Sequence, residues 1–338
     1  MIEIAQKVLY KLDPELAHHI ALNSLKVAHK FGMPALSREI VNENITVMGI
    51  EFPNRVGLAA GLDKNGDFID CLQALGFGFI EVGTVTPLPQ PGNPKPRLFR
   101  IPELEAIINR MGFNNKGVDY LITNAKRSAR KSVIGVNIGK NKSTSLANAF
   151  EDYSICLRKT YPIADYIVIN ISSPNTSGLR NLQTRTNLNS LLKHVQSERK
   201  HLEAEHNCSK PIVLKIAPDL KKNELFSILD LVGEHQINGV VATNTTTNRP
   251  DGNLASLSES GGLSGGPLTK ISTRVIEMIS ERTQGSLPII AAGGIMTDQD
   301  AFEKINAGAS LIQLYSGLVY KGPKLISDCV NKLSQIKQ

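Results

Sequence analysis

The feature that most constrains the fold is a regular alternation of short apolar runs with longer segments of helical spacing. Eight such runs are present: Val56 to Ala60, Phe79 to Val82, Val133 to Ile138, Tyr166 to Ile171, Ile212 to Ile216, Gly239 to Ala242, Ile289 to Ala292 and Leu311 to Leu314. Short apolar runs of this kind are typical of buried strands, and the segments between them are mostly helical in pattern. The alternation predicts an α/β fold.

Eight strands that alternate with helices suit a closed (β/α)8 barrel, or TIM barrel, whose active site forms at the C-terminal ends of the strands. The alternative is an open, doubly wound sheet, which binds dinucleotides through a GxGxxG motif directly after its first strand. The nearest candidate segment, Ala59 to Lys64, lacks that glycine spacing. The sequence therefore favours the barrel.

A small helical hairpin is predicted ahead of the barrel. Apolar residues recur at helical spacing from Ile2 to Leu12, and Asp13-Pro14-Glu15 then supplies an N-cap, a first-position proline and a first-turn acid for a second helix. We therefore divide the chain into residues 1–38, the hairpin, and residues 39–338, the barrel, which opens with a β-hairpin at Ile45 to Phe52. The apolar stripe of the helices either packs on the barrel or contacts a membrane surface.

Composition argues against several classes of protein. The cysteines, Cys71, Cys156, Cys208 and Cys329, lie far apart without a CxxC pair, so we expect reduced thiols and no metal site. The N-terminus lacks a signal-peptide pattern, and no stretch approaches the length needed to span a bilayer. The formal net charge is +7, but Lys and Arg are scattered and aromatic residues make up only 5%, so we expect no nucleic-acid partner.

Polar side chains recur at the same end of successive predicted strands. The segment Asn170-Ile171-Ser172-Ser173-Pro174-Asn175-Thr176 follows one strand, Asn137 closes another, and Thr243-Asn244-Thr245 closes a third. Asparagine both donates and accepts hydrogen bonds, so it matches the alternating N–H and C=O edge of a cyclic ureide. The same residue types also build ordinary turns. Their recurrence favours a site for a small polar heterocycle.

Glycine pairs mark the loops near the last two predicted strands. Gly293-Gly294 follows the seventh strand, Ser316-Gly317 follows the eighth, and Gly261 to Gly266 lies between the sixth and the seventh. In barrels, such loops commonly hold a phosphate through backbone N–H groups. Each pair alone also fits a tight turn, but together they predict a phosphorylated cofactor.

Two lysines at strand ends are candidate ligand contacts. Lys215 shares a strand face with Val213 and Ala217, while the neighbouring apolar residues take the other face. There it either extends its stem to water or stabilises negative charge on a reduced flavin ring. Lys64 can face a substrate carboxylate.

Eight segments of this chain match a known family: Leu12 to Glu15, Gly57 to Lys64, Glu81 to Pro87, Arg97 to Arg100, Asn109 to Asn115, Asn170 to Thr176, Lys215 to Asp219 and Thr243 to Thr246. They resemble the class 2 dihydroorotate dehydrogenases, the quinone-dependent flavoenzymes of pyrimidine biosynthesis, nearly from end to end. The resemblance implies oxidation of (S)-dihydroorotate to orotate, with FMN as hydride acceptor and a membrane quinone as the final electron acceptor.

The resemblance also implies the ligand contacts. For FMN these are Ala60, Gly61, Leu62, Asp63, Lys64, Thr84, Asn137, Asn170, Lys215, Thr243, Gly265, Gly294, Tyr315 and Ser316. For dihydroorotate they are Lys64, Asn109, Arg110, Met111, Gly112, Phe113, Asn170, Asn175, Asn244 and Thr245. Ser173 is implied as the base that takes a proton from C5 while hydride passes from C6 to the flavin. Serine is a poor base unaided, and Thr176 is our candidate for relaying the proton onward.

The N-terminal region separates the classes of this family. Class 1 relatives have a cysteine base and lack the helical hairpin, so Ser173 and residues 1–38 both indicate class 2. The resemblance implies a quinone passage in the hairpin, with His18, Arg100 and Tyr315 near its inner end. It also implies a peripheral protein, expected to be monomeric, on the cytoplasmic face of the cell membrane.

A further expectation concerns the loop that follows the Asn170 strand. Residues Asn175 to Leu182 are our candidate for a lid over the substrate, because Gly178 and small polar residues suit a hinge.

A class 1-like soluble enzyme stays open as an alternative activity. So does a flavin-dependent tRNA-dihydrouridine synthase, although it would need a catalytic cysteine that Asn170 to Thr176 lacks.

Overall fold

The computed structural model describes residues 10–32, 43–250 and 255–336. Its centre is a closed barrel of eight strands in the spatial order β10-β12-β13-β3-β4-β7-β8-β9, with every neighbouring pair parallel. The strands are β3 (Val56–Leu58), β4 (Phe79–Val85), β7 (Val133–Ile138), β8 (Tyr166–Asn170), β9 (Ile212–Ile216), β10 (Gly239–Ala242), β12 (Ile289–Ala292) and β13 (Leu311–Leu314). Each predicted apolar run supplies one of them, which confirms the (β/α)8 barrel.

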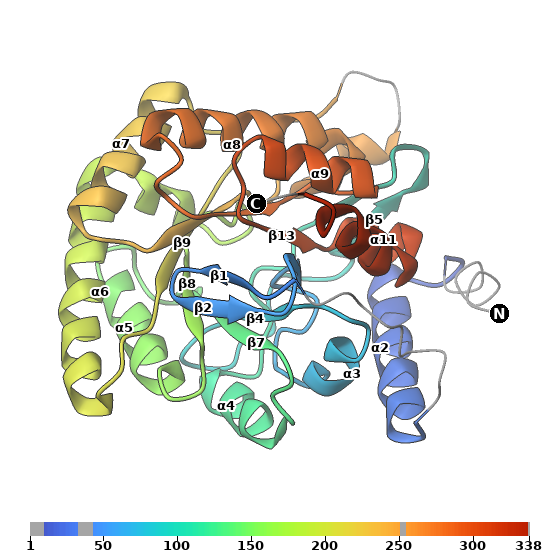
Figure 1. Ribbon diagram of the computed structural model, residues 1–338, viewed down its shortest axis with the longest axis horizontal. Coiled ribbons are helices and arrows are strands. Elements are labelled where there is room, and N and C mark those ends of the chain that lie inside the picture. Colours follow the sequence, from blue (N-terminus) through green and yellow to red (C-terminus); the bar gives the residue numbers. More distant parts are fainter. Residues whose placement is uncertain (1–9, 33–42, 251–254, 337–338) are drawn as a thin grey trace.

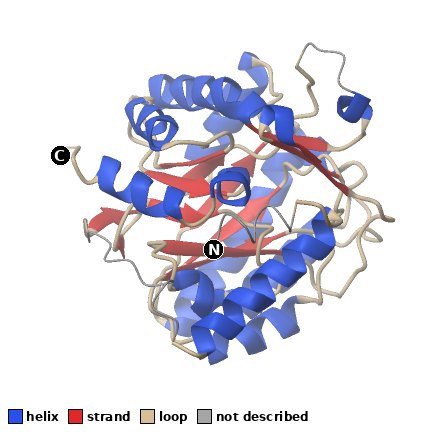
Figure 2. Cartoon of the chain, turned by 90° about the vertical axis from the view of Figure 1, so that its right-hand side faces the viewer, coloured by secondary structure: helices blue, strands red, loops and turns tan. Residues whose placement is uncertain are grey.

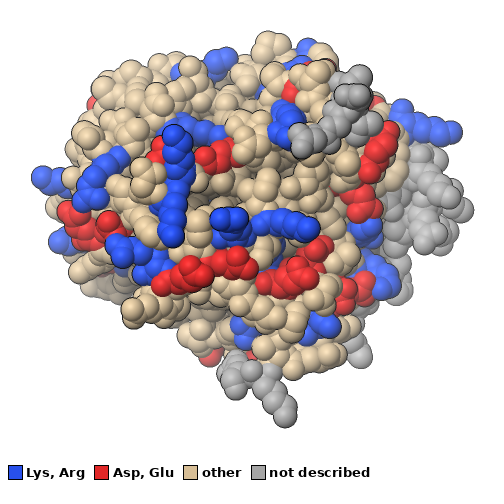
Figure 3. Space-filling view, turned by 90° about the horizontal axis from the view of Figure 1, so that it is seen from above, with Lys and Arg blue, Asp and Glu red and all other residues tan. Residues whose placement is uncertain are grey.

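Helices between the strands form the outer layer (Figures 1 and 2). They are α3 (Ile69–Gln73), α4 (Val118–Arg127), α5 (Ala149–Thr160), α6 (Arg185–His206), α7 (Lys222–Glu234), α8 (Thr269–Thr283), α9 (Asp298–Asn306), α10 (Ser316–Lys321) and α11 (Lys324–Leu333). Short 3-10 turns also occur, at η2 (Pro102–Leu104), η3 (Leu179–Gln183), η4 (Ala255–Ser258) and η5 (Gly266–Leu268). On the face that Figure 3 shows, Lys and Arg side chains lie among Asp and Glu side chains.

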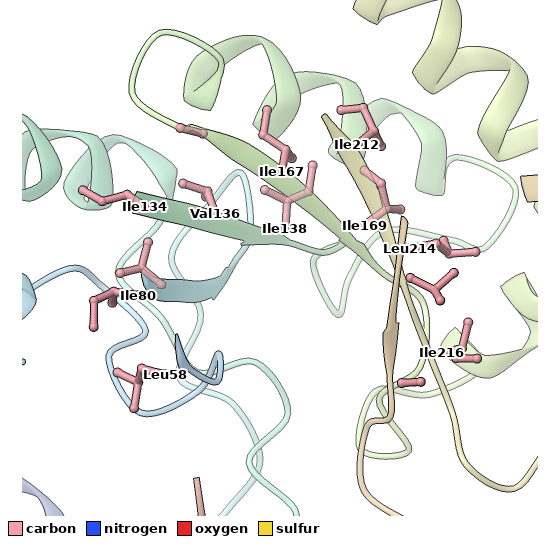
Figure 4. Packing of buried hydrophobic residues seen from close by; sticks show 14 of the residues in the cluster. Leu58, Ile80, Ile134, Val136, Ile138, Ile167, Ile169, Ile212, Leu214 and Ile216 are labelled. Carbon is pink, nitrogen blue, oxygen red and sulfur yellow. The ribbon is translucent and has the colours of Figure 1, made fainter. Parts of the chain in front are cut away.

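The strands separate two apolar cores, because successive side chains point to opposite faces. Ile134, Val136 and Ile138 of β7 face the helices, together with equivalent residues of β8 and β9 (Figure 4). The inward face fills the barrel, where Phe79 and Tyr166 are the largest side chains. The closed barrel is therefore a packed core rather than a channel.

Two strand glycines make room for those rings. A Cβ on Gly57 would lie 2.2 Å from the Phe79 ring, and a Cβ on Gly135 would lie 2.2 Å from the Tyr166 ring. The predicted β-hairpin, β1 (Ile45–Val47) with β2 (Ile50–Phe52), packs on the same inner core at the N-terminal strand ends. The opposite, C-terminal end is thereby left for a ligand site.

A second sheet was not predicted. Strands β5 (Leu98–Ile101), β6 (Ala106–Asn109) and β11 (Gly262–Gly265) pair antiparallel in the order β11-β6-β5. The predicted phosphate loop, residues 261–266, is thus largely strand. Glycine serves close approach here, since a Cβ on Gly265 (φ +97°) would lie 2.1 Å from the Glu105 carbonyl oxygen.

The helix predicted to begin at Pro14 is confirmed as α2 (Pro14–Lys30). The Asp13 carboxylate caps it by accepting hydrogen bonds from the N–H groups of Glu15 and Leu16, each at 3.0 Å. The helix packs on α3 and β5, and Figure 1 shows it at the edge of the barrel. The preceding predicted helix falls mostly on residues 1–9, and the boundary at residue 38 falls within 33–42; both lie outside the described residues.

The attachment of α2 includes a buried ion pair. The Arg97 guanidinium donates to both carboxylate oxygens of Glu15, at 2.7 and 3.1 Å, and both side chains are at most 8% exposed. On its other side the helix exposes Leu16, Ile20 and Val27. Among the described residues, no helix is long and apolar enough to cross a bilayer.

Candidate active site

A cavity opens at the C-terminal ends of the barrel strands, where the sequence places its polar loops. It encloses about 1060 Å³ of atom-free space, its open mouth included. Its walls come from β3, β4, β8, β9, β10, β12 and β13 and from the antiparallel β5-β6-β11 sheet. One cavity therefore collects side chains that are far apart in the sequence.

Most of the predicted ligand contacts line this cavity. They are Ala60, Gly61, Lys64, Thr84, Asn109, Met111, Gly112, Phe113, Asn170, Ser173, Asn175, Lys215, Thr243, Asn244, Thr245, Gly294, Tyr315 and Ser316. The other predicted contacts, Leu62, Asp63, Asn137, Gly265, Arg110 and Thr176, are not among its lining residues.

A buried polar layer forms the floor of the cavity. Asn170 Nδ2 donates to Thr84 Oγ1 at 2.9 Å, and Thr84 Oγ1 donates to Asn137 Oδ1 at 2.6 Å. Below them, Asn137 Nδ2 donates to Glu81 Oε1 at 2.8 Å. Asn137 therefore supports the floor instead of facing the open space, which explains why it lies beneath the lining residues.

Lys215 lies inside the barrel beside that layer. Val213 belongs to the inner core, while Ile212, Leu214 and Ile216 face the helices, so the predicted strand face of Lys215 is confirmed. Its Nζ lies 3.9 Å from a Glu81 oxygen. Burial lowers the pKa of Lys215, and the negative charge of Glu81 opposes that shift. The cavity floor thus holds a desolvated cation with a buried counter-ion.

Lys64 lies where the main cavity meets a second one. Its Nζ donates to the Gly61 carbonyl at 2.8 Å, and burial lowers its pKa to about 8. The second cavity is lined in part by Lys64 and His18, and burial lowers the His18 pKa to about 3. Neutral His18 therefore adds no positive charge beside Lys64 at neutral pH.

The residues predicted for quinone access are not brought together in one cavity. Tyr315 lines the main cavity, and His18 lines the second one. Arg100 lines neither of these two; its guanidinium donates to the carbonyls of Leu12 and Tyr10, so it ties the start of the N-terminal segment to β5.

Four asparagine side chains, Asn109, Asn170, Asn175 and Asn244, line the cavity together with Ser173 of the loop that follows β8. The Ser173 hydroxyl oxygen accepts a hydrogen bond from the Asn175 N–H at 3.2 Å. Asn175 Nδ2 donates to Asn109 Oδ1 at 3.1 Å, and Asn244 Nδ2 donates to Asn170 Oδ1 at 3.4 Å. The hydroxyl of Ser173 therefore lies among groups that can both donate and accept hydrogen bonds.

Thr176 does not contact Ser173 through a hydrogen bond. Its Oγ1 is buried and has no hydrogen-bond partner among the described residues. A direct relay between the two hydroxyls is therefore not formed in this structure, and a relay through Thr176 requires an intervening water.

The far end of the cavity has the predicted glycines. Gly293, Gly294, Ser316 and Gly317 line it together with Ser264, whose hydroxyl is 2.8 Å from that of Ser316. Gly294 has φ +71°, and a Cβ there would lie 2.2 Å from the Thr269 N. Gly294 therefore packs closely against the start of α8, and glycines and small hydroxyl groups line this part of the cavity.

The remaining predicted contacts have other partners. The Asp63 carboxylate accepts hydrogen bonds from the N–H groups of Asp67 and Phe68, and burial raises its pKa to about 6. The Arg110 guanidinium pairs with Glu259 at 2.6 Å and lies 4.5 Å from the centre of the Phe99 ring. These two side chains stabilise loops around the cavity.

Sequence reasoning missed several contributors to the site. Leu98 and Ile107 line the cavity from the unpredicted antiparallel sheet, and as apolar residues they gave no local signal. Gln313 was detectable, because a glutamine inside a buried strand is unusual. It donates through Nε2 to Glu81 and completes the polar layer.

The sequence and the fold both match known proteins. A family model described as dihydroorotate dehydrogenase matches residues 43–336. A protein of Nitrosospira multiformis named dihydroorotate dehydrogenase (quinone) is 52% identical over 98% of this chain and 96% of its own length. A protein of the same name from Neisseria meningitidis is 48% identical over 99% of this chain and 100% of its own.

Solved structures give the same result. The crystal structure of DHODH in complex with ferulenol from Eimeria tenella has a TM-score of 0.88 and 40% identity, covering 96% of this chain and 93% of that chain. The crystal structure of ligand-free DHODH from Eimeria tenella has a TM-score of 0.87 and 42% identity, and the match covers 95% of this chain and 94% of that chain.

Proposed function

The chain belongs to the dihydroorotate dehydrogenase family, and from this we propose that the mouth of its barrel binds FMN and dihydroorotate side by side. The relatives are quinone-dependent enzymes, so the reaction is the oxidation of dihydroorotate to orotate in pyrimidine biosynthesis, with a quinone as electron acceptor. They favour this reaction over that of a class 1-like enzyme or a tRNA-dihydrouridine synthase. Enzymes of the family depend on a flavin.

The residues that line the cavity fit FMN in their chemistry. Lys215, Asn170 and Thr84 supply a cation, an amide and a hydroxyl at the floor, where a polar ring edge would be held. Gly294 and Ser316 lie at the far end, where a phosphate would accept hydrogen bonds from small donors. When bound there, FMN supplies the acceptor for the substrate's hydride. Asn137 and Gly265 would act by supporting these contacts.

Dihydroorotate would occupy the part of the cavity nearest Ser173. The amides of Asn109, Asn170, Asn175 and Asn244 match the donors and acceptors of its ureide edge. Lys64 would oppose its carboxylate, and the segment from Met111 to Phe113 would close the same side. The substrate is thus oriented by hydrogen bonds from three separate loops.

Ser173 would act as the base at substrate C5. Its hydroxyl oxygen already accepts the Asn175 N–H, which leaves the hydroxyl hydrogen free to be passed on. Serine needs such an exit for its proton, because an alcohol is a weak base. We assign Thr176 as a relay that receives that proton through a water and passes its own hydroxyl proton onward to solvent, since its Oγ1 is buried and unpaired among the described residues.

Residues 1–38 would form the quinone-access unit, and residues 39–338 the FMN-binding barrel. The exposed Leu16, Ile20 and Val27 of α2 suit a peripheral position on the cytoplasmic face of the cell membrane. His18 is a residue of this helix and lines the second cavity. Arg100 binds the segment that precedes the helix, and Tyr315 lines the cavity at the barrel mouth. We expect a monomer.

The observation that carries the proposal is one cavity that holds Ser173, four asparagines and two lysines. The test is the visible spectrum of the purified protein under anaerobic conditions, before and after addition of dihydroorotate. Bleaching of an oxidised flavin band is the expected result. A flavin that does not bleach contradicts the substrate, and a colourless protein that cannot be reconstituted with FMN contradicts the cofactor.

A further inference from the structure

Arg180 connects three loops at the mouth of the barrel without lining the cavity. It belongs to η3, within the predicted lid, just after the segment that holds Ser173. Its Nε donates to the Ser172 carbonyl at 3.0 Å, its Nη1 to Asp219 Oδ2 at 2.7 Å, and its Nη2 to the Thr245 carbonyl at 2.9 Å. These acceptors belong to the loops after β8, β9 and β10, which are neighbours in the barrel.

Asp219 extends this junction on its other side. Its carboxylate also accepts hydrogen bonds from the Thr246 hydroxyl and from the Thr247 N–H, the latter at 3.0 Å. Arg180 and Asp219 are 23% and 15% exposed, so the pair is largely shielded from water. Gln183, also in η3, accepts a second hydrogen bond from the loop after β9, from the Ala217 N–H at 3.0 Å.

Each of the two anchored carbonyls belongs to, or directly precedes, a residue of the proposed substrate site. Ser172 precedes Ser173, and its hydroxyl accepts from Asn244 Nδ2 at 2.9 Å and donates to Asn170 Oδ1 at 2.9 Å. Thr245 itself lines the cavity. A shift of either anchored carbonyl would therefore move the proposed base relative to the amides that orient the substrate.

On these grounds we propose that Arg180 is a positioning residue for dihydroorotate oxidation, which locks the Ser173 loop to the Asn244-Thr245 loop through Asp219. The inference rests on the proposed function, because it assigns Arg180 a role through Ser173. Arginine is suited to this role, since its planar guanidinium donates in three directions at once, whereas the lysine ammonium is a single point charge. The reaction step affected is flavin reduction by substrate and not the later transfer of electrons to quinone.

The test compares the two half-reactions in Arg180→Ala by stopped-flow spectroscopy. At saturating dihydroorotate, we expect flavin reduction to slow about 10- to 100-fold, the size associated with a displacement of about 1 Å in a reacting group. The FMN content and the rate at which quinone reoxidises the reduced enzyme should match those of the parent. The flavin-reduction rate of Arg180→Lys should lie between those of the parent and of Arg180→Ala. Lysine keeps the positive charge opposite Asp219 but lacks the forked guanidinium.

Guanidinium ion provides a rescue that a general loss of stability would not show. At millimolar concentration it should restore part of the reduction rate of Arg180→Ala and none of that of Ser173→Ala, with equal sodium chloride as the control. The matched control variant is Arg158→Ala, because this side chain is 58% exposed and pairs with Glu198 at 2.8 Å. It should reduce and reoxidise at the parent rates.

Three results would overturn the role of Arg180. They are a reduction rate of Arg180→Ala within twofold of the parent, equal slowing of both half-reactions, and loss of FMN from both Arg180 variants. The last two assign Arg180 to general stability. A parent protein that dihydroorotate does not reduce contradicts the proposed function itself, so the two failures are distinguishable.

Discussion

Different kinds of interaction define the mouth of the barrel and the helix α2. At the mouth, buried polar side chains such as Asn170 and Thr84 each satisfy several partners through hydrogen bonds of fixed geometry. Helix α2 is attached by the buried pair of Glu15 with Arg97, and it exposes apolar side chains on its other side. We infer that the function of the barrel mouth is sensitive to the loss of single hydrogen-bonding atoms. The function of α2 depends instead on the ion pair that attaches it and on its total exposed apolar area.

The largest effect is expected for Ser173→Ala. Removal of the hydroxyl should slow flavin reduction by dihydroorotate about 10²- to 10⁴-fold, the range associated with loss of a general base. Flavin binding and reoxidation by quinone should persist. Stopped-flow absorbance measures both steps, and a reduction rate near that of the parent would remove Ser173 from the mechanism.

The attachment of α2 is tested by Glu15→Gln. Because Arg97 would be left buried beside a neutral group, we expect the free energy of unfolding to fall by about 3 kcal/mol, measured by chemical denaturation. Glu198→Gln is the control, since its partner Arg158 is 58% exposed and such pairs contribute at most about 1 kcal/mol. Equal effects of both variants would mean that the Glu15 pair does not anchor the helix.

The same pair predicts a pH dependence of stability. Burial raises the Glu15 pKa, but the hydrogen bonds and the charge of Arg97, with Lys95, outweigh burial and hold the pKa below its usual value. The stabilisation is therefore complete above the unfolded pKa of about 4.3 and is lost as pH falls through the lower folded value. Glu15→Gln should remove this part of the acid destabilisation, and an unchanged pH profile of unfolding would contradict the assignment.

At the mouth, the charge of Lys64 should control substrate affinity. Its pKa is lowered to about 8 by burial, so the cation is progressively lost as pH rises above that value. We expect kcat/KM for dihydroorotate to fall by up to about tenfold per pH unit above pH 8, as for any single required proton. Lys64→Arg keeps its charge at these pH values and should flatten the profile. A parent profile that is flat from pH 7 to 10 would contradict a carboxylate contact.

The smallest effect is expected for a single exposed residue of α2. Ile20→Ser should weaken binding to anionic lipid vesicles about three- to tenfold, because covering part of one isoleucine contributes roughly 1 kcal/mol. Ile155→Ser on α5 is the matched control, since the two residues are 41% and 37% exposed. Vesicle sedimentation measures both, and equal losses would place the lipid contact elsewhere.

The sequence predicted the barrel strands better than the antiparallel sheet beside them. The barrel strands were predictable because each is a continuous apolar run, and Asn170, Ser173 and Lys215 because polar residues interrupt or close those runs. The sheet of β5, β6 and β11 was not, because β11 is rich in glycine and its pairing with β6 joins distant segments. The partners of Glu81 and Arg180 depend on three-dimensional neighbours and have no sequence signal.

The most direct test of the account is a paired measurement of both half-reactions in one variant from each region. Ser173→Ala should lose flavin reduction by dihydroorotate and keep reoxidation by a vesicle-borne quinone. The double variant Ile20→Ser, Val27→Ser should keep reduction and lose much of the reoxidation. If both variants impair the same half-reaction, the division of labour between the barrel mouth and α2 is contradicted.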